Sequence, residues 1–327
     1  MTIKMTMIIM LIVLLILTTI SYLLQIEQFS AKPLLLQKEK IFTLSSGANQ
    51  YSLKIFLKKE HLVSSHIDQL SQLVTLEPKL ALIKAGTYRL TPGMTIRDLL
   101  LLLVSGKEAQ FPIRLAEGST LKECLNSLAQ APYLKHSQQE CIKLKNLLEG
   151  NFYPDTYLYT SSTFDSEILD RAQLRMETFL KKIWHERDKH LPYTSPNSLL
   201  IMASLIEKET SIKKEKARIA SVFINRLRIG MKLQSDPSVI YGINKDYHRG
   251  ITRKDLAVPT PYNTYFINGL PPTPIAIPSQ SSIEAAAHPE KSNYFYFVSD
   301  RNGGHIFSTN LINHNQAVQK YRKQRKI

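Results

Sequence analysis

Residues 196–210 read PNSLLIMASLIEKET and predict a helix that runs through Glu209. At 100° per residue, with Met202 placed at 0°, Ile206 lies at about 40° and Glu209 at about 340°. Glu209 therefore lies within the apolar stripe of this helix. Glu207 lies at about 140°, outside the stripe, and is expected to be solvated or salt-bridged.

The position of Glu209 has a chemical consequence. A carboxyl group in an apolar stripe is desolvated unless it is paired, and desolvation raises its pKa. Such a group stays protonated near neutral pH and can act as a general acid. The alternatives are a carboxylate that emerges from the core at the helix end, or one paired with a buried arginine such as Arg226. Glu209 is thus the candidate catalytic residue.

Groups suited to binding a sugar are frequent after this helix. Aromatic rings stack on pyranose faces, and amides bond to hydroxyl and acetamido groups near turns and clefts. The candidate substrate-binding residues are Asn225, Gln234, Asp236, Tyr241, Asn263 and Tyr265. Each is also typical of a turn or a cap, and Asp236, before Pro237, is interpreted as the N-cap of a short helix.

The rest of the second half of the chain is also predicted to be mainly helical. Periodicity and end signals predict helices over about 166–190 and 215–229 and a basic helix from about 310, with a proline-rich loop over 257–280. Two apolar stretches at 294–298 and 305–308 flank a glycine turn, which predicts a β-hairpin.

In the first half, three segments share one pattern. Residues 42–47, 88–93 and 113–118 each alternate in polarity and place a glycine three residues after a leucine, and an apolar helical run follows each. Alternation indicates a strand and glycine a turn. Residues 41–135 are therefore expected to form strand–turn–helix units, which serve either as a spacer or in ligand binding.

The N-terminus predicts a membrane anchor. Residues 5–26 carry no charge, and as a helix they would span roughly 33 Å, enough to cross a bilayer core. A cleaved signal peptide is the alternative, but its apolar region would be shorter and followed by a small-residue cleavage site. Lys4 before the run favours a cytoplasmic N-terminus, with the rest of the chain outside the cytoplasm.

Composition limits the classes of partner and cofactor that we expect for this chain. The 327 residues hold 42 Lys and Arg against 27 Asp and Glu, a net charge of +15, which implies an anionic neighbour. Outside the cytoplasm that neighbour is expected to be lipid or an acidic wall polymer, not nucleic acid. Two cysteines, Cys124 and Cys141, exclude a disulfide scaffold, although the two could pair. Nucleotide, zinc and serine-hydrolase motifs are absent, so no metal or cofactor is expected.

The chain resembles the endolytic murein transglycosylases, the YceG-like family. The segments that carry the resemblance are 202–210 (MASLIEKET), 220–242, 262–265 (YNTY), 269–272 (GLPP), 285–289 (AAAHP) and 303–305 (GGH). Residues 84–88 (KAGTY) resemble the LysM-like domain of the family. The departures are Ser235, where the family often has Thr, and a shorter stretch around 137–149.

The resemblance implies a function. It implies a single-pass lyase of the bacterial inner membrane, with a periplasmic catalytic domain, that cuts nascent peptidoglycan strands between MurNAc and GlcNAc. The products would be 1,6-anhydro-MurNAc ends that terminate strand elongation. The catalytic glutamate of the family, the second of Glu-Lys-Glu, corresponds to Glu209. Peptidoglycan synthases (penicillin-binding proteins) are implied as partners.

Two alternatives stay open beside this function. One is a hydrolytic muramidase in which Glu209 and Asp236 form an acid/base pair, and the other is a non-catalytic peptidoglycan-binding scaffold. The expected fold class is α+β. The expected parts are a cytoplasmic tip and transmembrane anchor (1–27), a stalk (28–40), a LysM-like α/β domain (41–106), a linking α/β subdomain (107–150) and a mainly helical catalytic domain with a small β-hairpin (151–327).

Overall fold

The structure is a computed structural model, and it describes residues 2–63, 66–136, 147–244, 250–301 and 303–323. The chain divides into two compact units, residues 1–111 with 159–162 and residues 112–158 with 163–327. The expected boundary after residue 106 therefore lies a little early. Most of the expected linking subdomain is grouped with the second unit.

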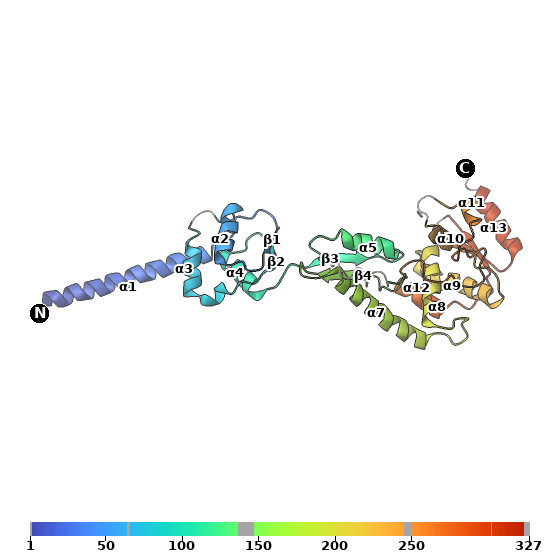
Figure 1. The fold of residues 1–327 in the computed structure, drawn as a ribbon, viewed down its shortest axis with the longest axis horizontal. Helices are drawn as coiled ribbons and strands as arrows, with labels where there is room; N and C mark the ends of the chain where they lie inside the picture. Colours follow the sequence, from blue (N-terminus) through green and yellow to red (C-terminus); the bar gives the residue numbers. More distant parts are fainter. Residues whose placement is uncertain (1, 64–65, 137–146, 245–249, 302, 324–327) are drawn as a thin grey trace. The chain divides into compact units, whose positions relative to one another are not determined.

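The first unit combines helices with one two-stranded sheet (Figure 1). Its elements are α1 (Thr2–Ser30), β1 (Lys40–Leu44), α2 (Gln50–Lys59), α3 (Gln69–Leu76), the 3-10 helix η1 (Pro78–Ala81), β2 (Gly86–Leu90) and α4 (Ile96–Ser105). Strands β1 and β2 pair antiparallel, with Phe42 opposite Tyr88. Buried side chains such as Leu53, Leu73 and Leu99 give this unit a hydrophobic core of its own.

Helix α1 is long and apolar enough to cross a membrane by length and composition. Its side chains are exposed from Ile3 to Gln25. The segment expected to be a stalk differs from the prediction, because α1 continues to Ser30 and both Phe29 and Leu34 are buried in the core of the first unit. Apolar side chains at these positions explain why the segment packs.

The three expected strand–turn–helix units are confirmed. They are β1 with α2, β2 with α4, and β3 (Phe111–Leu115) with α5 (Leu121–Ala129). Gly47, Gly93 and Gly118 have φ of 79°, 84° and 74°, a conformation that glycine adopts without a steric penalty. The helices begin at capping side chains, those of Asn49, Thr95 and Thr120.

The second unit is mainly helical. Besides β3 and α5, its elements are β4 (Asp155–Tyr159), α7 (Asp165–Glu186), α8 (Pro196–Glu209), α9 (Lys213–Arg228), α10 (Asp236–Gly242), α11 (Arg253–Leu256), α12 (Gln280–Ala287), β5 (Tyr296–Ser299), β6 (His305–Ser308) and α13 (Leu311–Lys323). β3 pairs with β4, and β5 with β6. The predicted helices, hairpin and proline-rich loop are present, with α7 ending four residues before the expected end.

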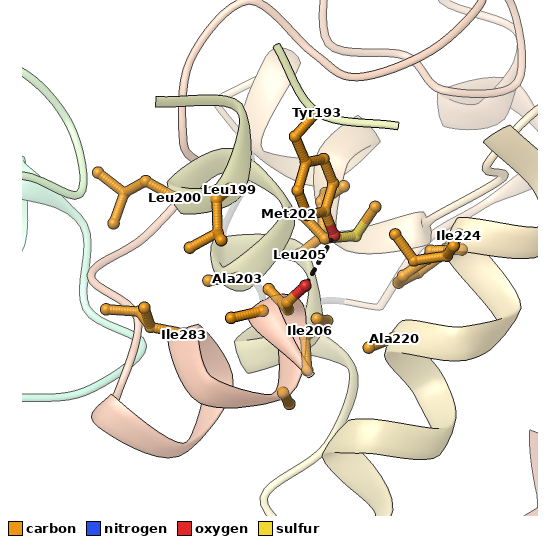
Figure 2. Packing of buried hydrophobic residues seen from close by; sticks show 14 of the residues in the cluster. Tyr193, Leu199, Leu200, Met202, Ala203, Leu205, Ile206, Ala220, Ile224 and Ile283 are labelled. Atoms are coloured by element: carbon orange, nitrogen blue, oxygen red, sulfur yellow. Dashed lines mark hydrogen bonds between the residues drawn. The ribbon is translucent and has the colours of Figure 1, made fainter. Parts of the chain in front are cut away.

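Helix α8 lies at the centre of this unit. It packs against α9 and α12, and Figure 2 shows its apolar side chains between Ala220 and Ile224 of α9 and Ile283 of α12. The hydroxyl of Tyr193 donates a hydrogen bond to the carbonyl of Ala286 across this core, at 3.2 Å. These contacts hold the C-terminal end of α8, and with it Glu209, in a defined position.

More of the surface of α8 is buried than the single apolar stripe that the sequence predicts. Every residue from Leu199 to Ile206 is buried, including Ser204 on the face that was expected to be polar. The Ser204 hydroxyl accepts a hydrogen bond from the backbone N–H of Ile275. The helix therefore has no solvated face over these two turns, because the loop before α12 covers the side opposite the predicted stripe.

Candidate active site

A cleft of about 380 Å³ opens beside the C-terminal end of α8. Helices α8, α9, α10 and α13, the loops before and after α10, and strand β5 all contribute to its lining. The lining residues are Glu209, Arg226, Gln234, Asp236, Tyr265, Tyr296, Phe297, Leu311, His314 and Asn315. Carboxyl, amide, guanidinium and aromatic groups thus line one space, where a ligand could make both hydrogen bonds and ring contacts.

Glu209 is the last residue of α8 and is half-buried at the edge of the cleft. Burial raises the pKa of Glu209 to about 7, with a further contribution from the negative charge of Asp236. The hydroxyl of Ser235 donates a hydrogen bond to Oε1 at 2.5 Å, and this bond and the charge of Arg226 act in the opposite direction. A large fraction of Glu209 is therefore protonated at neutral pH.

Arg226 does not neutralise this carboxyl group through a hydrogen bond. Its Nε donates to the carbonyl of Phe295 and its Nη1 to the carbonyl of Leu233, each at 2.7 Å. The buried guanidinium thus joins α9 to the residue just before strand β5 and to the loop before α10. The alternative in which Glu209 and Arg226 form an ion pair is not supported among the described contacts.

Glu207, two residues earlier, has a different environment. Its Oε2 accepts hydrogen bonds from the Lys216 ammonium at 2.9 Å, from the Ser282 hydroxyl at 2.6 Å, and from the hydroxyl and backbone N–H of Ser279. Burial alone would raise the pKa of Glu207, but these donors together outweigh it and lower the pKa below its usual value. The salt-bridged alternative for Glu207 is confirmed, and the pair is buried, not solvated.

The loop before α10 and the first residue of that helix bring two of the predicted residues, Gln234 and Asp236, into the cleft of Glu209. Gln234 has a φ of 51°, an uncommon conformation for a residue other than glycine, and its N–H donates to the carbonyl of Thr264. The next N–H, of Ser235, donates to the Thr264 hydroxyl. These bonds fix the loop so that the Ser235 side chain reaches Glu209.

Asp236 and Tyr265 form a pair in the same cleft. The Tyr265 hydroxyl donates a hydrogen bond to Oδ1 of Asp236 at 2.7 Å. The interpretation of Asp236 as an N-cap is wrong, because Ser235 occupies the cap position and Asp236 is the first residue of α10. The carboxylate is free to face the cleft because the cap needs no side chain from Asp236.

The three other predicted residues lie outside this cleft. Asn263 is fully buried and its amide donates to the backbone carbonyls of Leu256, the last residue of α11, and of Val258. The Asn225 amide donates to the carbonyls of Ser292 and Tyr294, and the Tyr241 hydroxyl donates to Glu149. Their polar groups have structural partners, and we leave them out of the proposed site.

The part of the cleft that the C-terminal hairpin and helix form was not predicted from the sequence. Tyr296 and Phe297 lie on β5, and Leu311, His314 and Asn315 lie on the first turns of α13. The predicted hairpin and basic helix indicated these elements but not where they pack. Among the described residues, no group of three or more His, Cys, Asp and Glu side chains could hold a metal ion. Cys124 is a buried free thiol, and Cys141 lies outside the described residues.

Comparisons with known proteins agree on one family. The model of the YceG-like family matches residues 42–320. An endolytic murein transglycosylase of Bacillus subtilis strain 168 is 32% identical over 307 residues, which are 85% of this chain and 83% of that protein. A protein of the same name from Streptococcus pneumoniae strain D39 is 30% identical over 282 residues, 73% of this chain but only 51% of the longer relative.

A solved structure also indicates the YceG-like family. The crystal structure of a YceG-like protein from Listeria monocytogenes is 28% identical, with a TM-score of 0.54, and covers 86% of this chain and 99% of that one. The family model spans most of the chain, and the Bacillus relative shares its sequence over most of both proteins. This chain therefore belongs to the YceG-like family.

Proposed function

We propose that this protein is a membrane-anchored lytic transglycosylase that cuts nascent peptidoglycan strands internally, between MurNAc and GlcNAc. The observation that carries the proposal is Glu209, a carboxyl group with a pKa of about 7 in a cleft lined by polar and aromatic side chains. The names of the Bacillus and Streptococcus relatives, endolytic murein transglycosylases, support the same activity.

The contacts of Glu209 suggest how the acid works. Because Ser235 donates to Oε1, the proton of the neutral acid resides on Oε2. Oε2–H donates its proton to the glycosidic oxygen as the bond from this oxygen to C1 of MurNAc breaks. The resulting carboxylate then takes the proton of the muramyl 6-hydroxyl while O6 bonds to C1, which regenerates the acid and leaves a 1,6-anhydro end.

This reaction consumes no water and needs no second catalytic carboxylate. The 6-hydroxyl is part of the same sugar, so it attacks with the advantage of an intramolecular nucleophile. A hydrolytic muramidase is the second candidate, because Asp236 lines the same cleft and could serve as its second carboxylate. The two reactions leave different ends on the product.

The anchor and the first unit complete the proposal. Helix α1 would hold the protein in the inner membrane with the catalytic unit in the periplasm, near synthases that make the strands. We propose that the first unit is LysM-like and binds glycan weakly. Its separate core, and a surface pocket of about 420 Å³ around Asn49, Tyr51 and Lys54, support a binding role.

The test is the chemistry of the cleaved end. Purified full-length protein is given nascent glycan strands in water enriched in ¹⁸O, and the products are analysed by mass spectrometry. We expect anhydro-MurNAc ends without ¹⁸O. Reducing MurNAc ends that carry ¹⁸O would favour the muramidase, and intact strands would favour a non-catalytic scaffold. For the anchor, the mature protein should retain its N-terminus and fractionate with the inner membrane.

A further inference from the structure

His314 is the one side chain of the cleft with a buried polar atom that lacks a partner. Its Nδ1 is shielded from solvent and makes no hydrogen bond to the described residues. Elsewhere in the cleft the polar groups closest to Glu209 are paired, since Ser235 bonds Glu209 and Tyr265 bonds Asp236. A buried nitrogen without a partner costs free energy, which a ligand that supplies the missing bond would recover.

The imidazole packs against an aromatic ring of the cleft. The rings of His314 and Tyr296 stack with centroids 5.1 Å apart and an interplanar angle of 23°. The Arg226 guanidinium also lies over the Tyr296 ring, 5.4 Å from its centroid. Burial, and then the charge of Arg226, lower the pKa of His314 below its usual value, so the ring is neutral at neutral pH and has an acceptor nitrogen.

The surroundings of this acceptor are partly apolar. Phe297 and Leu311 line the same cleft, and Leu311 is 52% exposed although it is a large apolar side chain. Helix α13 packs mainly against β5 and β6 and buries none of its own residues, so small adjustments of His314 and Leu311 disturb no core. An acceptor beside apolar groups matches an acetamido group, which has an N–H donor and a methyl group.

We propose that His314 and Leu311 form an acetamido subsite of the cleft, which selects strands whose sugar carries an N-acetyl group at C2. The acetamido N–H donates a hydrogen bond to the acceptor nitrogen of His314, and the acetyl methyl packs against Leu311 and Phe297. His314 is thus a specificity residue on α13, more than 100 residues after Glu209 in the sequence. The inference rests on the proposed function for the choice of glycan.

The first experiment follows the NMR signal of the His314 ring and does not depend on catalysis. The full-length protein in detergent micelles, ¹³C-labelled in its histidine rings, is titrated with chitohexaose and with cellohexaose, which differ only in acetamido against hydroxyl at C2. The His314 signal is assigned by its loss in His314→Asn. We expect chitohexaose to shift it at a roughly tenfold lower concentration than cellohexaose. Equal responses, or no response to chitohexaose, would overturn the subsite.

A matched pair of variants separates hydrogen bonding from packing. His314→Phe keeps an aromatic ring on Tyr296 but removes the acceptor, whereas His314→Asn loses the ring but retains an acceptor oxygen near the Nδ1 position. We expect the KM for glycan strands to rise roughly tenfold in His314→Phe, with a smaller change in kcat, and to stay near wild type in His314→Asn. Equal losses in both variants, or a loss only in His314→Asn, would mean that the ring merely packs.

A third variant, Leu311→Ser, tests the apolar half of the subsite at an exposed position where folding is not at risk. It should raise the KM roughly threefold, and an unchanged KM would contradict the methyl contact. These results are distinct from those that test the proposed function. If the wild type made no anhydro ends, the proposed function would fail, while the titration would still report whether His314 recognises the acetamido group.

Discussion

Glu207 and Glu209 belong to the same turn of α8 and have opposite chemistry. Glu207 lies in a buried pocket with four donors to one oxygen, one of them the ammonium of Lys216. Glu209 lies in a cleft where a single hydroxyl, of Ser235, donates to it and the charge of Asp236 repels it. Burial raises the pKa of both, but only in Glu207 do the donors outweigh it.

The difference shows that burial alone does not make a catalytic acid. A carboxylate that is fully supplied with donors is a structural anion, and here it ties α8 to α9 and to the start of α12. A carboxyl group that is buried with few donors remains partly protonated and keeps an oxygen free for a substrate. The predictions below test this contrast.

The largest effect is expected for Glu209, the proposed catalytic carboxyl group. Glu209→Gln keeps the shape of the side chain but cannot exchange a proton, so formation of anhydro ends should fall at least about 10³-fold, while folding and glycan binding stay nearly intact. Glu207→Gln should cost far less activity per folded molecule. Anhydro ends formed by both purified variants on the same strands are the measurement, and equal losses would refute the contrast.

For the free energy of unfolding we expect the opposite order, with a larger loss in Glu207→Gln than in Glu209→Gln. Glu207→Gln leaves the Lys216 ammonium buried without its counter-charge, which should lower the free energy of unfolding by about 3–5 kcal/mol. Urea denaturation of the full-length protein in micelles measures this loss. The double variant Glu207→Gln, Lys216→Met should recover most of it, and a single variant as stable as wild type would show that the ion pair is dispensable.

The two carboxyl groups should also give stability opposite dependences on pH. The pKa of Glu209 is raised from 4.5 to about 7, so its contribution is present below its unfolded pKa and is lost as the pH rises through 7, by about 3 kcal/mol in total. The pKa of Glu207 is lowered, so its contribution is present above its unfolded pKa and is lost as the pH falls through its folded pKa.

Accordingly, Glu209→Gln should gain stability relative to wild type as the pH rises from 5 to 8, measured by urea denaturation at each pH. A pH-independent difference between the two proteins would show that Glu209 ionises normally. Activity should follow the same group, so kcat of the wild type should decrease above pH 7 as the general acid loses its proton.

The smallest effect is expected at the single donor to Glu209. Ser235→Ala removes a hydrogen bond that lowers the pKa of Glu209, so the alkaline limb of the pH–activity profile should move to higher pH. Ser235→Thr keeps the hydroxyl and should leave the profile in place. A profile that is the same in all three proteins would mean that Ser235 does not tune the acid.

Much of the fold could be predicted because its signals are local. The bounds of α8, the three strand–turn–helix units and the C-terminal hairpin follow from periodicity, glycine and capping residues. Strand β4 is not among the predicted elements, because five residues from Asp155 carry too little pattern to indicate a pairing with β3. The packing of the segment expected to be a stalk could not be predicted, because burial of Phe29 and Leu34 depends on tertiary contacts.

Only the part of the candidate site that lies on a single helix, α8, could be predicted from the sequence. The helical wheel separated Glu209 from Glu207, although the face of Glu207 turned out to be buried as well. Polar residues near turns were only a weak guide, because an amide such as that of Asn263 can bond the backbone of its own loop. The position of His314 could not be predicted, because it depends on how α13 packs on the hairpin.

The most direct test of the account is the titration of the two carboxyl groups in one protein. Full-length protein labelled with ¹³C at the glutamate carboxyl carbons is titrated by NMR in micelles, and Glu207→Gln and Glu209→Gln assign the two signals. We predict that Glu209 titrates with a pKa of about 7 and that Glu207 titrates below the usual value of 4.5. Two ordinary titrations near 4.5, or a raised pKa at Glu207 instead, would contradict it.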